Sequence, residues 1–196
     1  ANLTGWLQGM REGSIVVLAI IMGLMLAFDM GGPVNKVAYA FMLICVSQGV
    51  YSVVAIAAVG IAVPPLGMGL ATLIGRKYFT AEERETGKAA LVMGCVGVTE
   101  GAIPFAAADP LRVIPANMIG AASGCVTAAL MGAQCYAGWG GLIVLPVVQG
   151  KLGFVAALLV GACVSAACVI LLKAFAKKKP TDVAADDELD LDFEIN

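Results

Sequence analysis

Three long apolar runs constrain this sequence more than any other feature. Residues 37–63, 113–137 and 152–172 contain no charged side chain. About 20 apolar residues in a helix span the ~30 Å hydrocarbon core of a bilayer, so each run is long enough to cross a membrane. Only 13% of the 196 residues are charged, whereas about 25% is usual in soluble domains. The sequence therefore predicts an all-α integral membrane protein embedded in a lipid bilayer.

Two further apolar runs are short or interrupted. Residues 14–28 are too short to span and lead into a polar, glycine-containing break at 29–36. Residues 89–108 are interrupted at 97–104 by glycines, a glutamate and a proline. Non-helical backbone at membrane depth persists only where it is buried in protein or lines a cavity. We therefore expect a helical bundle with broken helices, in which Pro64 and Pro65 also end the helix of the second run.

Basic residues predict the orientation of the chain. Flanks rich in Lys and Arg face the cytoplasm, and such residues follow the last apolar run and occupy the polar loop near residue 80. The residues concerned are Lys173, Lys177, Lys178 and Lys179, and in the loop Arg76, Lys77, Arg84 and Lys88. The runs at 113–137 and 152–172 cross out and back, so the run at 89–108 begins and ends on the cytoplasmic side. It is predicted to be a re-entrant hairpin with its tip at 97–104. The alternative is a plain span with Glu100 inside a packed bundle.

Glu100 is the leading candidate for a site residue. An ionisable group within a membrane costs about 2.5–3.5 kcal/mol on insertion scales and by default indicates function. Thr99 and Gly101 flank it, and glycine lets a ligand approach the backbone closely. A broken helix near mid-membrane is where transporters bind substrate, and a carboxylate can accept several hydroxyl hydrogen bonds. The alternative is a structural carboxylate paired with Arg112 or Lys36.

Other polar groups extend this hypothesis. Asp29, Asn35 and Lys36 form a second polar island, in which the Asn35 amide offers both a donor and an acceptor to a sugar hydroxyl; an ordinary extracellular turn with an ion pair is the alternative. Trp139 lies between glycines and would either stack on a sugar ring or sit in the interfacial aromatic belt. Asp109 and Arg112 flank Pro110 and are predicted to form a local ion pair at a helix start.

Metal and nucleophile chemistry has little support in this sequence. The chain has no histidine, and its six cysteines lie in apolar stretches without a Cys-x-x-Cys pair. A zinc site of His and Cys is therefore not expected. We expect no metal, no cofactor and no catalytic residue in this chain.

The charge distribution separates two regions. Seven of the 14 acidic residues lie in residues 180–196, which are predicted to be a disordered acidic tail on the cytoplasmic side. Residues 1–179 are predicted to form the membrane part. The chain begins without methionine and without a signal-peptide pattern, so we expect a segment of a larger protein.

Several motifs resemble one family of permeases. The segment GVTEGAIPF followed by ADPLRVIP resembles the signature of the fructose-type C domain of bacterial phosphotransferase-system enzyme II. The segment DMGGPVNK resembles a second landmark of the same family. Two further matches are VPPLGM and GG followed by VLPVV, and the resemblance runs from about residue 10 to about residue 175. The matching segments are residues 97–105, 108–115, 29–36, 63–68 and 140–148.

The resemblance implies a function for the chain. A C domain binds a hexose, here fructose or a fructose-like sugar, in the bacterial inner membrane and presents it to a B component phosphorylated on cysteine. Phosphoenolpyruvate is the ultimate donor, through an A component upstream. The glutamate of the motif, here Glu100, would contact sugar hydroxyls. The protein would form a homodimer, and no nucleic-acid partner is expected. The chain would be part of a phosphotransferase whose phosphate-carrying residues lie elsewhere.

Two departures from the family pattern qualify what the resemblance implies. Trp139 stands where many members have histidine, which points to a fructose-like sugar rather than to one identified sugar. The chain is shorter than a whole C domain and resembles its C-terminal portion. Two other classes remain open: an ion-coupled or facilitative transporter without phosphorylation, with Glu100 as a proton or cation site, and a membrane protein that does not transport.

Overall fold

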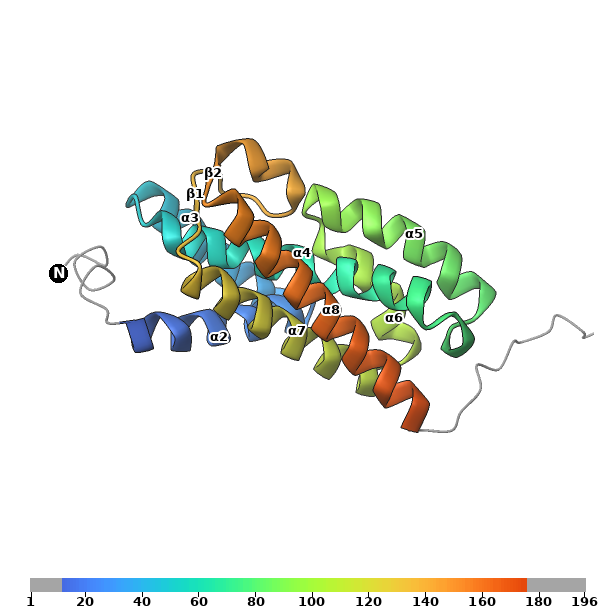
Figure 1. The fold of residues 1–196 in the computed structure, drawn as a ribbon. Coiled ribbons are helices and arrows are strands. Elements are labelled where there is room, and N and C mark those ends of the chain that lie inside the picture. The colour runs from blue at the N-terminus through green and yellow to red at the C-terminus, as the bar shows by residue number, and fades with distance from the viewer. Residues whose placement is uncertain (1–11, 176–196) are drawn as a thin grey trace, which may run out of the picture.

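The computed structural model describes residues 12–175, which are almost entirely helical (Figure 1). The predicted acidic tail and the lysines at 177–179 lie outside these residues. The α-helices are α2 (Glu12–Phe28), α3 (Pro33–Ser47), α4 (Tyr51–Ile74), α5 (Ala81–Val96), α6 (Ile103–Ala108), α7 (Pro110–Leu130) and α8 (Lys151–Phe175). The shorter elements are η1 (Arg76–Tyr78), η2 (Thr99–Ala102), η3 (Leu142–Val147), β1 (Gln134–Cys135) and β2 (Val148–Gln149).

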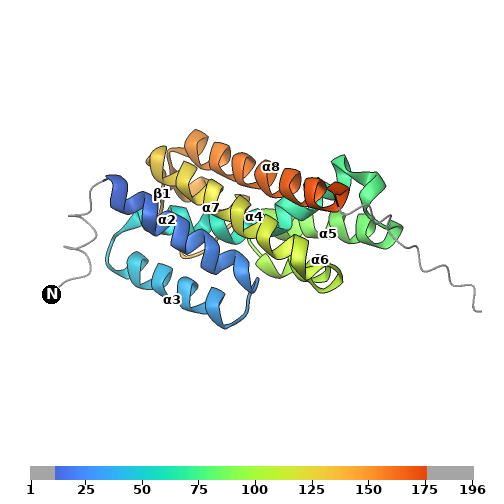
Figure 2. The ribbon, with the colours of Figure 1, turned by 90° about the horizontal axis from the view of Figure 1, so that it is seen from below.

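Helix α4 runs through the middle of the bundle, with α2, α5, α7 and α8 around it (Figures 1 and 2). In the most apolar stretch of α4, 89% is buried inside the protein, whereas the corresponding shares are 44% in α7 and 39% in α8. Within residues 12–175, these three helices are long and apolar enough to cross a membrane. The predicted all-α membrane fold is therefore confirmed, and α4 is the helix that the other elements shield.

Pro64 and Pro65 lie inside α4, so the prediction that a helix ends at them is wrong. Each proline removes one helical donor, and the carbonyls of Gly60 and Ile61 lose their usual partners. The hydroxyl of Thr99, 38 residues away in the chain, donates to the Ile61 carbonyl at 3.0 Å. A side chain from another element thus replaces one missing donor, and the helix continues past both prolines.

Helices α2 and α3 form a hairpin, and its turn is the polar break that the sequence predicted. Met30 (φ 46°) and Gly31 (φ 113°) have left-handed backbone there. The break is shorter than expected because α3 already begins at Pro33, and proline is favoured at the first helical position.

The second apolar run is two helices, so the expectation of one span over residues 37–63 is wrong. Helix α3 ends with Gly49 in the left-handed conformation (φ 73°). The Val50 amide donates to the Cys45 carbonyl at 2.9 Å, and the Gly49 amide to Val46 at 3.1 Å. This pair of bonds is the Schellman motif, which satisfies carbonyls at a helix end. The chain then turns back as α4.

Helices α5 and α6, with η2 between them, form a second hairpin. Helix α5 starts with a capping box, in which Thr80 and Glu83 bond each other's backbone amides. It ends at Gly97 (φ 88°), where the Val98 amide donates to the Met93 carbonyl at 2.9 Å. The hairpin expected around residues 97–104 is therefore present.

The two hairpins enter the bundle from opposite ends (Figures 1 and 2). The α2–α3 hairpin lies at the end that also carries β1 and β2, whereas the α5–α6 hairpin lies at the end where α8 finishes. Their turns meet near the middle of the molecule, where a Cβ atom at Gly31 would lie 2.7 Å from Glu100 Oε1.

Helix α7 is shorter than its apolar run predicted, because it ends at Leu130 and not near residue 137. Gly132 (φ 62°) follows, and β1 then pairs antiparallel with β2. Residues 138–141, between β1 and η3, return to the middle of the molecule and pass close to Gly97.

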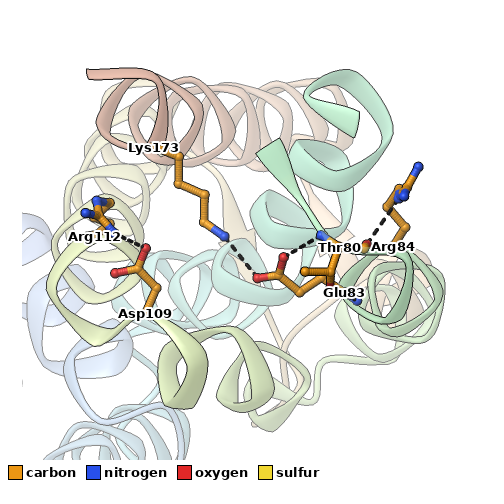
Figure 3. A network of polar contacts seen from close by, with 6 residues as sticks. All are labelled: Thr80, Glu83, Arg84, Asp109, Arg112 and Lys173. Carbon is orange, nitrogen blue, oxygen red and sulfur yellow. Dashed lines mark hydrogen bonds and ion pairs between the residues drawn. The ribbon is translucent and has the colours of Figure 1, made fainter. Parts of the chain in front are cut away.

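Two ion pairs lie at the α8 end of the bundle, and one of them connects two helices (Figure 3). Lys173 on α8 lies 2.9 Å from Glu83 on α5, with side chains only 11% and 17% exposed. Arg112 and Asp109 form the local pair that the sequence predicted, at 2.6 Å. The end of α8 and the basic loop near residue 80 therefore lie at one end of the molecule, as the orientation argument required.

Candidate functional site

A cavity of about 200 Å³ lies where the turns of the two hairpins meet. Helix α3, helix α4, the second hairpin and the 138–141 loop all contribute to its wall. The lining residues are Gly31, Asn35, Lys36, Tyr39, Ile61, Gly97, Thr99, Glu100 and Trp139. Four of the six predicted site residues are among them. The cavity is smaller than the ~300–1,000 Å³ of drug-sized sites, so it suits a small ligand.

Glu100 is exposed toward this cavity at the start of η2. Among residues 12–175 it forms no ion pair, and Arg112, one of the two partners considered for it, pairs with Asp109. Lys36 lines the same cavity from α3, and its side chain is likewise outside the ion pairs of the described residues. The cavity therefore contains one carboxylate and one ammonium group, contributed by different hairpins.

Thr99 and Asn35 line the cavity but use polar atoms to hold its wall. The Asn35 side-chain amide donates to the Leu26 carbonyl at 2.6 Å, near the end of α2. The Thr99 hydroxyl donates to Ile61 of α4, as described above. Both residues are buried, since Asn35 is 7% exposed and Thr99 is 4% exposed. Their bonds fix the two hairpin turns against neighbouring helices, which positions Glu100.

Trp139 and Tyr39 form the aromatic part of the wall. Their ring centroids are 6.4 Å apart and the rings are perpendicular. The Trp139 indole N–H donates to the Val96 carbonyl at 2.7 Å, and the Tyr39 hydroxyl donates to the Gly138 carbonyl at 3.0 Å. Such rings offer apolar faces to a ligand beside the charged groups.

Asp29 and Gly101 lie next to the cavity and are not part of its lining. The Asp29 carboxylate accepts hydrogen bonds from the amides of Val34 (2.7 Å) and Asn35 (2.9 Å). It thus satisfies the free amides at the start of α3 and keeps the turn in shape. A Cβ atom at Gly101 would lie 3.0 Å from the Met93 side chain, so glycine there allows η2 to approach α5.

Tyr39 and Ile61 were not among the predicted site residues. Tyr39 follows Asn35 by four positions, so both lie on one face of α3. That spacing could have identified it once Pro33 was taken as the helix start. Ile61 contributes from the middle of a uniform apolar run, which carries no local signal of its position.

Within residues 12–175, no group of His, Cys, Asp and Glu side chains is arranged to hold a metal ion. Cys135, which lies in β1 outside the three candidate spans, is buried, and burial raises the pKa of its thiol. A raised pKa keeps the thiol protonated and weakens it as a nucleophile. The residues that line the cavity offer charged groups, hydroxyl and amide groups, and aromatic rings.

Comparison with known proteins gives consistent matches. Over 196 residues the chain is 78% identical to the fructose-like permease IIC component 2 of Escherichia coli (strain K12), covering all of this chain and 55% of that protein. It is 45% identical over 189 residues to the PTS system fructose-specific EIIB'BC component of the same organism, covering 94% of this chain and 32% of that protein. It is 37% identical over 188 residues to the fructose-specific EIIC component of Haloferax volcanii, covering 95% and 50%.

The chain thus spans about half or less of the length of these curated relatives. No family model matches it, and no solved structure matches it.

Proposed function

Since the chain belongs to the family of fructose-type C components of phosphotransferase-system permeases, we propose that it forms part of a sugar-translocating membrane subunit. This subunit binds a hexose, fructose or a fructose-like sugar, and presents it to a phosphorylated B component during transport. The observation that carries the proposal is the Glu100 carboxylate, which faces a small cavity between two hairpin turns without an ion pair among the described residues.

The chemistry of the cavity supports a neutral polyol as ligand. Glu100 accepts hydrogen bonds from hydroxyl groups, and Lys36 donates to hydroxyl oxygens. Because the two charges have opposite sign, a neutral sugar can satisfy both without bringing an unpaired charge into the membrane. The volume of about 200 Å³ suits one monosaccharide rather than a larger saccharide.

We further propose that the α8 end of the bundle faces the cytoplasm of a bacterial inner membrane. Arg76 and Lys77 are exposed in η1, which contacts α8. Basic flanks favour the cytoplasmic side. The B component would then meet the sugar from this end, in keeping with relatives whose names join B and C components. The phosphate-carrying residue would be supplied by that component, and a homodimer is part of the same proposal.

The test is a comparison of labelled hexose uptake and phosphorylation by the full-length permease with its phosphorylated B component. Glu100→Gln keeps the shape of the side chain and removes its charge. We expect it to lower uptake and phosphorylation together by tenfold or more, because a hydrogen bond to a charged group is worth about 1.5–3 kcal/mol. Glu82→Gln, the same change at an exposed position of α5, is the matched control.

Full activity of the Glu100→Gln variant, with normal membrane insertion, would remove Glu100 from the sugar site. A wild-type protein that moves sugar and never phosphorylates it would instead support a facilitative or ion-coupled transporter.

A further inference from the structure

Residues 138–141 contact both hairpins and α4 at the cavity. On the first hairpin, the Tyr39 hydroxyl donates to the Gly138 carbonyl at 3.0 Å. On the second, the Trp139 indole N–H donates to Val96 at 2.7 Å. On α4, the Ala58 carbonyl accepts a hydrogen bond from the Gly141 amide at 3.4 Å. One short loop thus connects three elements that lie far from it in sequence and that together line the cavity.

The bond from Trp139 satisfies a backbone group that the helix leaves free. Val96 is the last residue of α5, and the carbonyls at a helix C-terminus have no donor within the helix. The bonds of Val98 and Gly97 satisfy the carbonyls of Met93 and Gly94, and the Val96 carbonyl is satisfied by the indole. The tryptophan therefore fixes the point at which α5 turns toward Glu100.

Glycine positions show how closely the loop approaches this turn. A Cβ atom at Gly97 would collide with the Gly140 carbonyl and would lie 2.9 Å from Trp139 Nε1. A Cβ atom at Gly141 would lie 2.5 Å from the Gly97 amide nitrogen. Both glycines have positive φ, at 88° and 83°. The contact leaves no room for side chains, so a small displacement of the loop changes the turn.

We propose that Trp139 is a positioning residue for the sugar site: its indole N–H holds the 138–141 loop against the end of α5 and thereby sets the position of the turn that carries Glu100. This inference rests on the proposed function and assigns Trp139 a role other than ring stacking. Because the N–H is already bonded to Val96, the indole has no donor left for a ligand. Tyr39 acts on the same loop from the opposite hairpin.

The first test needs no sugar. In the full-length permease in detergent, hydrogen exchange is measured at the peptide that contains Gly141, whose amide donates to Ala58. Trp139→Phe and Tyr39→Phe should each accelerate exchange there several-fold, because each removes one hydrogen bond that holds the loop. Tyr136→Phe is the matched control, since its hydroxyl bonds exposed Gln134 outside the cavity.

The second test uses labelled fructose as the probe in vesicles that contain the permease and the phosphorylated B component. Trp139→Phe keeps an aromatic ring and removes the N–H, and we expect it to raise the KM about threefold to tenfold. Combined with Tyr39→Phe, the effect should be less than additive, because both residues hold one loop.

The proposal would be overturned if Trp139→Phe had wild-type hydrogen exchange and a wild-type KM while Trp139→Leu had a raised KM. That result would assign ring stacking to Trp139. A wild-type protein inactive with every hexose would count against the proposed function. Hydrogen exchange measured without sugar would still decide whether Trp139 holds the loop.

Discussion

Glycine at position 31 gives the Glu100 carboxylate its place against the turn of the first hairpin. Its φ is 113°, and a Cβ atom there would lie 2.7 Å from Glu100 Oε1. Gly49 has a similar left-handed backbone (φ 73°) with no atom within 4 Å of such a Cβ. The two glycines therefore have a similar backbone constraint, and only Gly31 also lies against Glu100, the residue proposed to bind the sugar.

This difference predicts distinct outcomes for two matched substitutions. Gly31→Ala and Gly49→Ala should each lower stability by about 1 kcal/mol, because alanine is strained at positive φ. Only Gly31→Ala should also weaken hexose binding, by about tenfold, since it displaces the carboxylate. Thermal unfolding and equilibrium sugar binding, both in detergent, measure the two effects. Equal loss of binding in both variants would mean that Gly31 acts through stability alone.

Sequence reasoning identified the residues of the cavity unevenly. Glu100, Thr99, Asn35 and Trp139 were predicted because each is a polar or aromatic group in an apolar or glycine-rich context. The separate roles of these residues could not be predicted. The Thr99 hydroxyl donates a hydrogen bond to the carbonyl of Ile61, 38 residues away. Such a pairing follows from tertiary packing and not from the local sequence pattern.

At the scale of elements, Glu83 joins the second hairpin to α8. One carboxylate oxygen accepts from the Thr80 amide at 2.8 Å, and the other lies 2.9 Å from Lys173. The Lys173 ammonium also lies 4.2 Å from the centroid of the Phe79 ring. The start of α5 is thereby fixed to the end of α8, and this contact lies far from the turn that carries Glu100 (Figures 1 and 3).

Breaking this contact should reduce stability. Because the Glu83 and Lys173 side chains are only 17% and 11% exposed, Lys173→Met should lower the unfolding free energy by about 1–3 kcal/mol. In the double variant with Lys173→Met and Glu83→Gln, the loss of unfolding free energy should be smaller than the sum of the losses in the two single variants, since the partners are coupled. Lys88→Met, which removes the pair of Lys88 with Glu85 at 64% and 73% exposure, should cost less than about 1 kcal/mol. Thermal unfolding of the full-length permease checks these values; equal losses for Lys173→Met and Lys88→Met would contradict them.

Helix starts were easier to predict than helix ends. The Thr80–Glu83 capping box was visible in the sequence and is present. The end of a helix was wrongly predicted at the prolines in α4. The helix continues there, and the Ile61 carbonyl accepts a hydrogen bond from the distant Thr99 hydroxyl in place of the lost amide donor. Gly49 was overlooked because it is one small residue in an apolar run, although glycine is the residue that a left-handed helix end requires.

At the scale of the whole molecule, the two hairpins and the three long helices give a consistent topology. The positive-inside rule and the number of crossings predicted the second hairpin, and the structure contains it. The first hairpin was expected only as a break, because splitting the second apolar run depends on Gly49. The two turns meet at the cavity from opposite ends of the bundle (Figure 2).

The proposed orientation predicts the reactivity of single cysteines introduced into a full-length permease from which the native cysteines have been removed. Glu82 is exposed in the first turn of α5 and Ser47 is the exposed last residue of α3. Helix α5 starts at the end of the bundle where α8 finishes, whereas α3 ends at the opposite end (Figure 1). A membrane-impermeant thiol reagent should label Glu82→Cys in inverted vesicles and Ser47→Cys in right-side-out cells. The reverse pattern would place the α8 end outside the cytoplasm.

The binding of sugar by Glu100 in the cavity between the hairpins can be measured as an equilibrium, apart from transport and phosphorylation. The dissociation constant for labelled fructose, and for a panel of other hexoses, is measured on the full-length permease without the B component. We predict that Glu100→Gln raises the dissociation constant of the best-bound hexose by tenfold or more, while Glu82→Gln leaves it unchanged. An unchanged dissociation constant in a correctly folded Glu100→Gln variant would mean that Glu100 does not bind the sugar.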